Sequence, residues 1–415
     1  MSRLMLSFLR VGILALAILG TALAQSLTFW SWRPEDKEFY DDIARQFEAQ
    51  TGIKVVFTAY KNTDYNTALS SALAAGSGPD IIQTRAYGGL AQLADAGYLL
   101  PIVSQEVKGL DKFPRTLLNA ARGYKDKRLF GVPFATQTLG IFYNKALLKK
   151  AGMELPQTWG AFLGTLEKLK KAGITPLANG AKDGWTLEIM FGVVGPNFYG
   201  STGFYNEVVG GKRTFNDPVF VRALKEEAQL TPYMPQGFMG VGYDDMRTLF
   251  INEQAAFFIG GSFEIGYFRA QNPKLDFGFM AAPPLVQGGR PWVSSFADGN
   301  YSINAKTTHK KEALEFLSFL ASKEFGQQFT DKLAQISAVP GLTSKDPVLS
   351  QVIELTAKYQ TPYLMLVGFR YQNPTGSFLL QNGLQSLLDG KATAEQVAAD
   401  ITKGVATWYA PFQGK

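Results

Sequence analysis

The sequence contains no cysteine and a single histidine, His309. Without cysteine the chain has no disulfide, no thiolate nucleophile and no cysteine metal ligand. Any histidine-based catalytic triad would have to use His309, which stands beside Lys310 and Lys311 at the start of an amphipathic segment. A solvated residue at a helix end explains His309 better than a catalytic role does. The sequence therefore has few of the residue types that serve as catalytic nucleophiles, general bases or metal ligands.

The sequence signatures of common enzymes are missing as well. It has no G-x-S-x-G, no H-E-x-x-H, no phosphate-binding P-loop and no G-x-G-x-x-G after a strand. No acidic cluster has the spacing of an EF-hand calcium loop. Two carboxylates for glycoside hydrolysis need to meet only in space, so a secreted carbohydrate-active enzyme remains an alternative. Asp244 and Asp245 are adjacent, and a solvated helix face explains them equally well. We therefore predict no catalytic residue, no cofactor and no metal.

Charge is sparse and evenly spread. Charged residues make up 18% of the chain and hydrophobic residues 46%, as in a folded globular protein. The net charge of +6 arises from lysines and arginines scattered along the sequence rather than gathered in a basic stripe. A nucleic-acid partner is therefore not expected. The length suggests two or more domains.

Residues 1–24 have the pattern of a secretory signal peptide. Arg3 and Arg10 precede the apolar run 11–20, and an A-x-A-like site follows at 22–24. The apolar run is too short to span a membrane, which takes roughly 20 residues. We expect an exported, periplasmic protein that starts near Gln25. Without a cysteine at the cleavage site it would be soluble rather than lipid-anchored.

Strands and helices alternate in the first hundred residues. Pro34 suits the first turn of a helix, and Phe39, Ile43 and Phe47 then give that helix one apolar stripe. Gly52 stops the helix. The resulting β-α-β-α-β-α order indicates an α/β fold with a mainly parallel sheet covered by helices. The three predicted strands are 27–32, 53–59 and 80–84.

The pattern changes in the middle of the chain. A strand at 139–144 enters a new unit of amphipathic helices. Pro283-Pro284 and Gly288-Gly289 mark a linker or crossing, after which 293–303 returns to the composition of a strand. The tail from 338 to 415 is predicted to be mostly helical.

Aromatic residues are abundant, at 13% of the chain, and many stand next to turns and polar side chains. The first strand ends in "SLTFWSWRPED", where Trp30 points toward the core and Trp32 lies at the strand end. Aromatic faces stack on sugar rings, while carboxylates, amides and arginines bond their hydroxyls. Because the crevice of an open α/β sheet lies at the carboxyl ends of its strands, we expect a ligand to touch Trp32. Core packing is the alternative for each aromatic taken alone.

Six segments in a fixed order support a resemblance to a known family. They are "TFWSW", "FEAQTGIKV", "ALAAGSGPDII", "IFYNKALLKKAG" followed by "LPQTW", "EQAAFFIGGSFEI" and "HKKEALEFLSFLAS". Over essentially its whole length the chain resembles the extracellular solute-binding proteins of bacterial ABC sugar transporters, in the family that includes the maltose- and trehalose-binding proteins.

The resemblance implies a two-lobed periplasmic binding protein fold. Each lobe is expected to be a mainly parallel sheet flanked by helices, with ligand in the cleft and closure by hinge bending. Each lobe should be discontinuous in sequence. The implied N-terminal lobe is 25–135 and 284–338, the C-terminal lobe is 136–283 and 339–415, and the hinge crossings fall near 134–138, 283–286 and 338–341.

The resemblance also implies a set of ligand-binding residues. Trp185 is added from its position in a polar loop. The sequence departs from many relatives at Phe263, where they have Trp, and from some at Arg85, where they have Asp. The expected ligand-binding residues are Trp32, Arg33, Glu35, Arg85, Tyr87, Gln137, Trp185, Gly261, Ser262, Phe263, Gly299, Asn300 and Arg370.

The function implied is capture and transport, without catalysis. The chain would bind a glucose-containing α-linked disaccharide or short oligosaccharide and deliver it to the permease subunits of the transporter. We expect a monomer. An acidic sugar or another anion remains an alternative ligand for the same fold, and convergence of Arg33, Arg85 and Arg370 would favour it.

Overall fold

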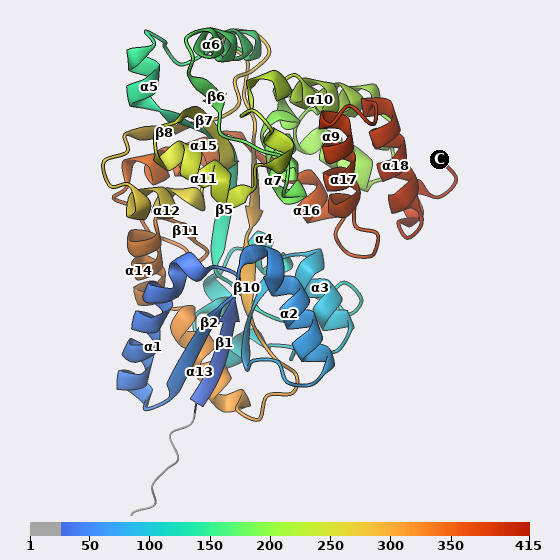
Figure 1. Cartoon of the computed structure of the whole chain (residues 1–415). Coiled ribbons are helices and arrows are strands. Elements are labelled where there is room, and N and C mark those ends of the chain that lie inside the picture. The colour runs from blue at the N-terminus through green and yellow to red at the C-terminus, as the bar shows by residue number, and fades with distance from the viewer. Residues whose placement is uncertain (1–25) are drawn as a thin grey trace, which may run out of the picture.

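The computed structural model describes residues 26–415 and arranges them in two lobes joined by extended segments (Figure 1). The predicted signal peptide, 1–24, lies outside the described residues. Within the described part, no helix combines the length and the apolar character needed to cross a membrane.

The first lobe is built on a five-stranded sheet. In order across the sheet, the strands are β2 (Lys54–Ala59), β1 (Ser26–Ser31), β3 (Ile81–Arg85), β10 (Gly299–Ile303) and β4 (Val132–Pro133). Strand β1 pairs in parallel with β2 and β3, and β10 pairs antiparallel with β3 and β4. The helices of this lobe are α1 (Lys37–Thr51), α2 (Asn62–Ala74), α3 (Gly88–Asp95), α4 (Arg115–Asn119), α13 (Lys310–Leu320) and α14 (Lys323–Leu333).

The turn from β1 into α1 forms as its sequence predicts. A short 3-10 helix, Pro34–Asp36, leads directly into α1. Phe39, Ile43 and Phe47 are buried along one face of α1. Gly52 ends α1 with a φ of 75°, a left-handed conformation that glycine adopts without a steric penalty. The loop between β1 and α1 is thereby held at the carboxyl end of the sheet.

The second lobe is built around β5 (Ala135–Asn144). The first half of β5 pairs with β9 (Val293–Ala297) and β11 (Ile336–Ser337), and its second half with β7 (Ala255–Gly261) and β8 (Phe277–Met280). The outer strands are β12 (Gln360–Pro362) beside β9 and β6 (Thr175–Leu177) beside β7. The helices of this lobe are α5 (Lys145–Lys150), α6 (Trp159–Lys171), α7 (Gly184–Val194), α8 (Pro196–Tyr199), α9 (Thr202–Val209), α10 (Pro218–Ala228), α11 (Tyr243–Ile251), α12 (Glu264–Gln271), α15 (Pro347–Tyr359), α16 (Leu364–Gly368), α17 (Gly376–Leu388) and α18 (Ala394–Ala406).

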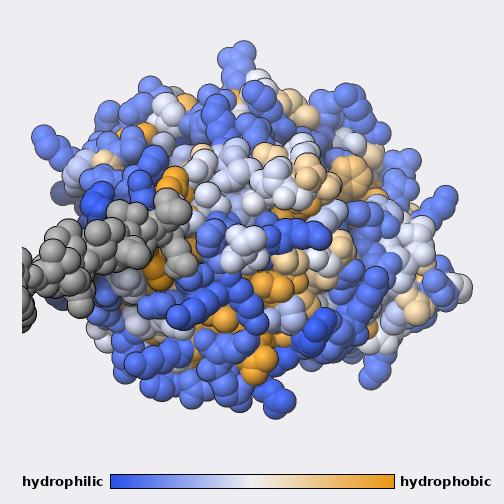
Figure 2. All heavy atoms as spheres, turned by 90° about the horizontal axis from the view of Figure 1, so that it is seen from below, coloured by the Kyte–Doolittle hydropathy of each residue, from blue (hydrophilic) through white to orange (hydrophobic). Residues whose placement is uncertain are grey.

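The two-lobed α/β fold is confirmed, but the expectation of mainly parallel sheets is wrong. The first sheet mixes parallel with antiparallel pairs, and the second is mainly antiparallel. Every antiparallel pair of the described sheets includes β5 or β10, the strands that follow the first two crossings. Each lobe has its own hydrophobic core. One core packs around β1 and α1, and the other around α7, α10 and α17. The face seen from below carries small apolar patches separated by hydrophilic side chains (Figure 2).

One crossing differs from its predicted position. Strand β9 pairs with β5 in the second sheet, and β10 lies in the first sheet, so the chain crosses between Ala297 and Gly299. The expectation placed this crossing near 283–286. Residues 293–297 therefore belong to the second lobe. The pairing of β9 with β5 decides where the chain crosses, and no local sequence pattern encodes that pairing.

Polar side chains connect the crossing segments to each other. The amide nitrogen of Gln137 donates to Asp298 at 3.0 Å and to Gln335 at 2.9 Å. The amide oxygen of Gln137 accepts from the Ser262 hydroxyl at 2.6 Å. Because the side chain of Gln137 is fully buried, this network satisfies groups that would otherwise destabilise the hinge.

Candidate functional site

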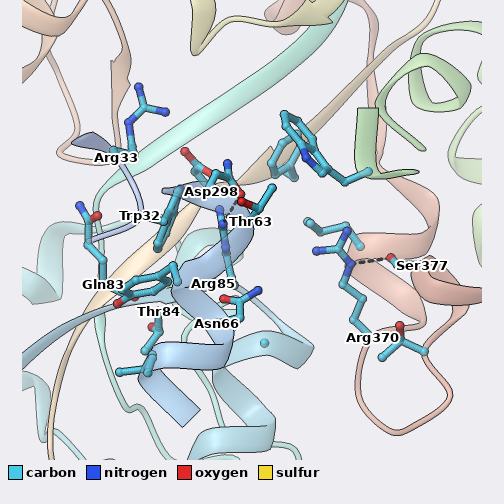
Figure 3. A pocket seen from close by; sticks show the side chains of 18 of the residues that line it. Trp32, Arg33, Thr63, Asn66, Gln83, Thr84, Arg85, Asp298, Arg370 and Ser377 are labelled. Carbon is cyan, nitrogen blue, oxygen red and sulfur yellow. Dashed lines mark hydrogen bonds between the residues drawn. The ribbon is translucent and has the colours of Figure 1, made fainter. Parts of the chain in front are cut away.

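A cleft of about 580 Å³ lies between the lobes. Its lining comes from both lobes, and its volume falls in the range of small-molecule sites. The first lobe contributes the ends of β1 and β3 and one face of α2, and the second lobe contributes α7, α17 and the loop before α17 (Figure 3). The carboxyl ends of β1 and β3 thus meet the ligand space, as expected for an open α/β sheet.

Seven of the thirteen sequence-predicted residues line this cleft. They come from both lobes and from segments far apart in the chain. The seven are Trp32, Arg33, Glu35, Arg85, Trp185, Phe263 and Arg370.

The other six predicted residues lie behind the cleft wall. Gln137 and Ser262 belong to the crossing network, and Gly261 is a buried residue at the end of β7. A Cβ at Gly299 would lie 2.8 Å from the Trp32 ring, so this glycine leaves room for the indole. The complete set outside the lining is Tyr87, Gln137, Gly261, Ser262, Gly299 and Asn300.

Tyr87, which is partly buried, and Asn300, which is fully buried, also lie outside the cleft lining. The hydroxyl of Tyr87 accepts a hydrogen bond from the backbone N–H of Ala297, at the second crossing. The amide of Asn300 is buried in β10 without a hydrogen-bond partner among residues 26–415. Neither side chain faces the cleft, so the prediction that they contact ligand has no geometric support.

Trp32 is covered by Arg85. The guanidinium carbon of Arg85 lies 3.8 Å from the centroid of the Trp32 ring, and Trp32 is only 2% exposed. Tyr65 and Phe134 pack against the indole at ring distances of 5.7 and 5.8 Å. In this conformation Arg85 covers the ring of Trp32, on which the expectation placed the ligand. Both side chains line the cleft, and stacking of a ligand on Trp32 stays a prediction.

Arg85 differs from the other cleft arginines in its partners. Its Nη2 donates to the amide oxygen of Asn62 at 2.9 Å, and Asp298 acts on it only through charge. Burial lowers the pKa of Arg85 to about 10, Asp298 offsets part of that effect, and Arg370 adds to it. Burial thus destabilises the charged form of Arg85, and any hydrogen-bond acceptor that enters the cleft would stabilise it.

Arg33 is paired within its own lobe. Its Nε lies 2.5 Å from Asp36 Oδ2, and its Nη2 lies 3.6 Å from Glu35 Oε1. Burial opposes ionisation of Glu35, but Arg33 and Arg247 outweigh it, so the pKa of Glu35 lies below its ordinary value. The charge of Arg33 is thus already balanced.

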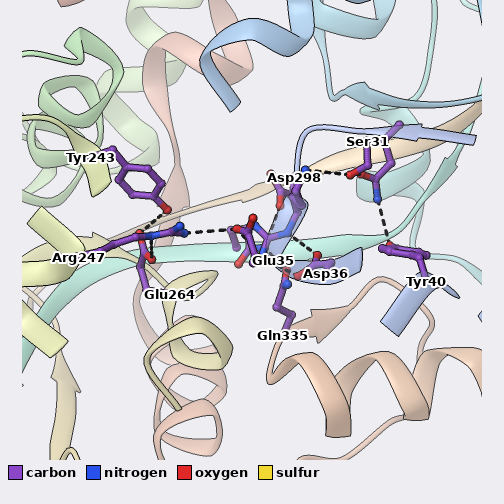
Figure 4. Close-up of polar contacts among 12 residues, drawn as sticks. Ser31, Glu35, Asp36, Tyr40, Tyr243, Arg247, Glu264, Asp298 and Gln335 are labelled. Atoms are coloured by element: carbon purple, nitrogen blue, oxygen red, sulfur yellow. Dashed lines mark hydrogen bonds and ion pairs between the residues drawn. The ribbon is translucent and has the colours of Figure 1, made fainter. Parts of the chain in front are cut away.

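Arg247 connects the two lobes. From α11 its Nη2 reaches Glu35 Oε1 of the first lobe at 3.4 Å, and its Nε reaches Glu264 Oε2 at 2.8 Å (Figure 4). Its guanidinium lies 3.9 Å from the ring of Tyr243 and 4.0 Å from that of Tyr267. This cation thus contacts two cleft-lining side chains, Glu35 of the first lobe and Tyr243 of the second.

Arg370 is paired with a buried carboxylate. Its Nη2 lies 2.9 Å from Glu188 Oε2, and its Nε donates to the Ser377 hydroxyl (Figure 3). Gln381 also donates to Glu188, at 2.5 Å. Of the three arginines expected to converge, two therefore have carboxylate partners. The cleft is less cationic than its sequence suggested.

Sequence reasoning missed several lining residues. Asn62, Asn66 and Ser70 recur every four residues along one face of α2, and this polar stripe was a readable signal. Asp298 lies beside the predicted Gly299. Tyr363, Phe378 and Gln381 come from the helical tail, where no local pattern distinguishes a cleft face from any other.

The site offers hydrogen bonds and aromatic surface. The indole nitrogen of Trp185 is buried without a hydrogen-bond partner in the described chain. Phe378 lines the cleft with 57% of its surface exposed. Residues 26–415 contain no group of three or more His, Asp or Glu that could hold a metal ion. Such a lining is suited to binding an organic ligand.

Comparisons with known proteins agree with this geometry. The model of the family described as bacterial extracellular solute-binding protein matches residues 30–327. A multiple sugar-binding protein of Streptococcus mutans is 25% identical over 354 residues, covering 81% of this chain and 82% of that protein. A maltodextrin-binding protein of Bacillus subtilis is 25% identical over 316 residues, covering 73% and 70%. A solved chitin oligosaccharide binding protein has the same fold, with a TM-score of 0.81 at 23% identity, covering 93% of this chain and 100% of that one.

Proposed function

Because this chain belongs to the bacterial extracellular solute-binding protein family, we propose that it captures a sugar between its lobes and delivers it to the permease of an ABC transporter. The names of the sugar-binding relatives support the ligand class. Membership of a binding-protein family excludes the alternative of a secreted carbohydrate-active enzyme. We further propose that it acts as a periplasmic monomer that starts near Gln25.

One observation carries the sugar proposal. Aromatic rings and paired polar groups face each other across a cleft between two lobes. Aromatic rings pack on the apolar faces of a sugar. Polar groups whose charge is already balanced can still form hydrogen bonds with sugar hydroxyls, and they need no charged ligand. The indole N–H of Trp185, which has no partner among residues 26–415, supplies a donor that a ligand hydroxyl can satisfy.

The size of the cleft supports a ligand longer than one ring. Its volume is about 580 Å³, and its lining includes the arginines and Trp185, one face of α2 and the exposed ring of Phe378. We propose a glucose-containing α-linked disaccharide or short oligosaccharide. The maltodextrin-binding relative supports this choice.

A second candidate ligand is an acidic sugar or other anion. Arg85 favours it, because its direct hydrogen-bond partner is the neutral amide of Asn62. Against it stand the carboxylates that pair with Arg33 and Arg370. The neutral sugar is therefore the leading proposal.

The test is titration calorimetry of residues 25–415 with glucose, maltose, trehalose, sucrose, longer maltodextrins and glucuronate. We expect one-to-one binding of a neutral sugar with a free energy of roughly −8 kcal/mol or better. Binding of glucuronate alone would favour the second candidate. No heat with any member of the panel would contradict the sugar proposal.

A further inference from the structure

Glu188 is a buried carboxylate in an apolar helix. It lies in the middle of α7, where its neighbours from Thr186 to Val194 are all buried, and none of its own surface is exposed. Burying a carboxylate strongly destabilises a protein unless the carboxylate is paired and hydrogen-bonded. An apolar side chain of similar volume would fit this helix at lower cost. The presence of Glu188 therefore calls for a role beyond packing.

All partners of Glu188 line the cleft, although Glu188 does not. Its Oε2 accepts from Arg370 at 2.9 Å and from Gln381 at 2.5 Å, and its Oε1 accepts from Ser377 at 2.6 Å. These donors come from a segment that begins 182 residues later in the chain. One carboxylate thus fixes three cleft side chains and balances the charge of the guanidinium among them.

We propose that Glu188 is a specificity-determining positioning residue. By neutralising Arg370 and orienting Ser377 and Gln381, it biases the cleft toward uncharged sugars and against acidic ones. This inference rests on the proposed function, in that it concerns the selectivity of the same cleft. Arg370 is partly open to the cleft, with 24% of its side chain exposed, so an unpaired guanidinium there would meet an anionic ligand directly.

The test uses Glu188→Gln, which keeps the shape and removes the charge. Calorimetry would compare wild type and variant with the neutral sugar that binds in the panel, and with glucuronate and galacturonate, at low and high salt. We expect the affinity ratio of uronate to neutral sugar to rise by about tenfold or more at low salt and by less at high salt. The double variant Glu188→Gln with Arg370→Gln is the matched control and should lose this gain.

Two further arms keep the inference falsifiable. If Glu188→Gln does not fold, Glu188→Met suits the apolar surroundings of α7 and also leaves Arg370 unpaired, so it should shift the ratio in the same direction. If wild type binds no sugar, the proposed function fails. The thermal shift that glucuronate produces in variant and wild type then still decides whether Glu188 excludes anions. An unchanged ratio, or an equal thermal shift, would reduce Glu188 to a purely structural residue.

Discussion

Gly88 of the first lobe faces the backbone of Arg370 in the second lobe. A Cβ at residue 88 would lie 2.2 Å from both the carbonyl carbon and the carbonyl oxygen of Arg370. The same carbonyl accepts a hydrogen bond from Gln92 at 2.6 Å. The lobes can approach this closely only because residue 88 lacks a side chain.

Gly88→Ala should hold the lobes apart without unfolding either one. Small-angle scattering should give a larger radius of gyration than for wild type, and sugar affinity should fall by about tenfold, since closure becomes less favourable. Gly160→Ala is the matched control, because residue 160 also lies in the first turn of a helix and its Cβ would meet nothing within 4 Å. A radius and an affinity equal to those of wild type would show that this contact does not limit closure.

Trp32→Ala should destabilise the first lobe rather than act on binding alone. The indole is buried against Tyr65 and Phe134, so its removal leaves a cavity that costs about 3–5 kcal/mol in the free energy of unfolding. Urea unfolding measures this loss, and Trp32→Phe should lose less. Full stability combined with lost sugar binding would instead make Trp32 a ligand contact.

Trp185→Phe should weaken sugar binding with little effect on stability. An aromatic ring is kept beside Tyr243, whose ring centroid lies 4.5 Å from that of Trp185, while the five-membered half of the indole is removed with its N–H, which has no partner among residues 26–415. A hydrogen bond to a ligand hydroxyl contributes about 1 kcal/mol, so affinity should fall roughly fivefold by calorimetry. Trp185→Ala, which also removes the ring, should lose more. Equal affinities of wild type and Trp185→Phe would mean that the indole nitrogen does not contact ligand.

Glu227 should make stability depend on pH. Both of its carboxylate oxygens are buried in α10 without partners in the described chain, and burial raises the pKa well above the ordinary value of 4.5. The folded state then binds more protons than the unfolded state above that value, so stability falls as pH rises. Glu227→Gln removes this dependence. The free energy of unfolding of the variant should therefore rise relative to that of wild type by up to about 1.4 kcal/mol for each unit of increasing pH.

Urea unfolding of both proteins from mildly acidic to mildly alkaline pH would measure that difference. Glu48→Gln, at an exposed position of α1, serves as the control and should follow the wild-type curve. Parallel curves for wild type and Glu227→Gln would mean that the Glu227 carboxyl is not held protonated.

The sequence predicted the elements whose signals are local. The structure confirms the apolar stripe of Phe39, Ile43 and Phe47 and the helix end at Gly52, because both signals lie within the sequence of a single helix. The ends of β1 and β3 reach the cleft because parallel strands share that edge. The burial of Trp32 could not be read from the sequence, since it depends on Arg85, more than fifty residues away.

Long-range register accounts for the other differences. Pro283-Pro284 resembled a crossing, but the pairing of Gln137 with Phe296 keeps this part of the chain in the second sheet until Ala297. Gln137 was predicted to bind ligand, and its amide is instead fully engaged by Ser262, Asp298 and Gln335. Only tertiary contacts decide which of two such roles a buried amide takes.

The position of β10 in the first sheet sets the order in which the molecule can mature. Strand β10 lies between β3 and β4 in the sheet. The hydroxyl of its Tyr301 forms a hydrogen bond of 2.6 Å with the hydroxyl of Tyr40 in the core. During synthesis the first half of the chain emerges without this central strand, so the first lobe stays incomplete until the second-lobe segments from β5 to β9 have been made. A nascent chain that lacks β10 is therefore a fragment of both lobes rather than one finished domain and an unfinished neighbour.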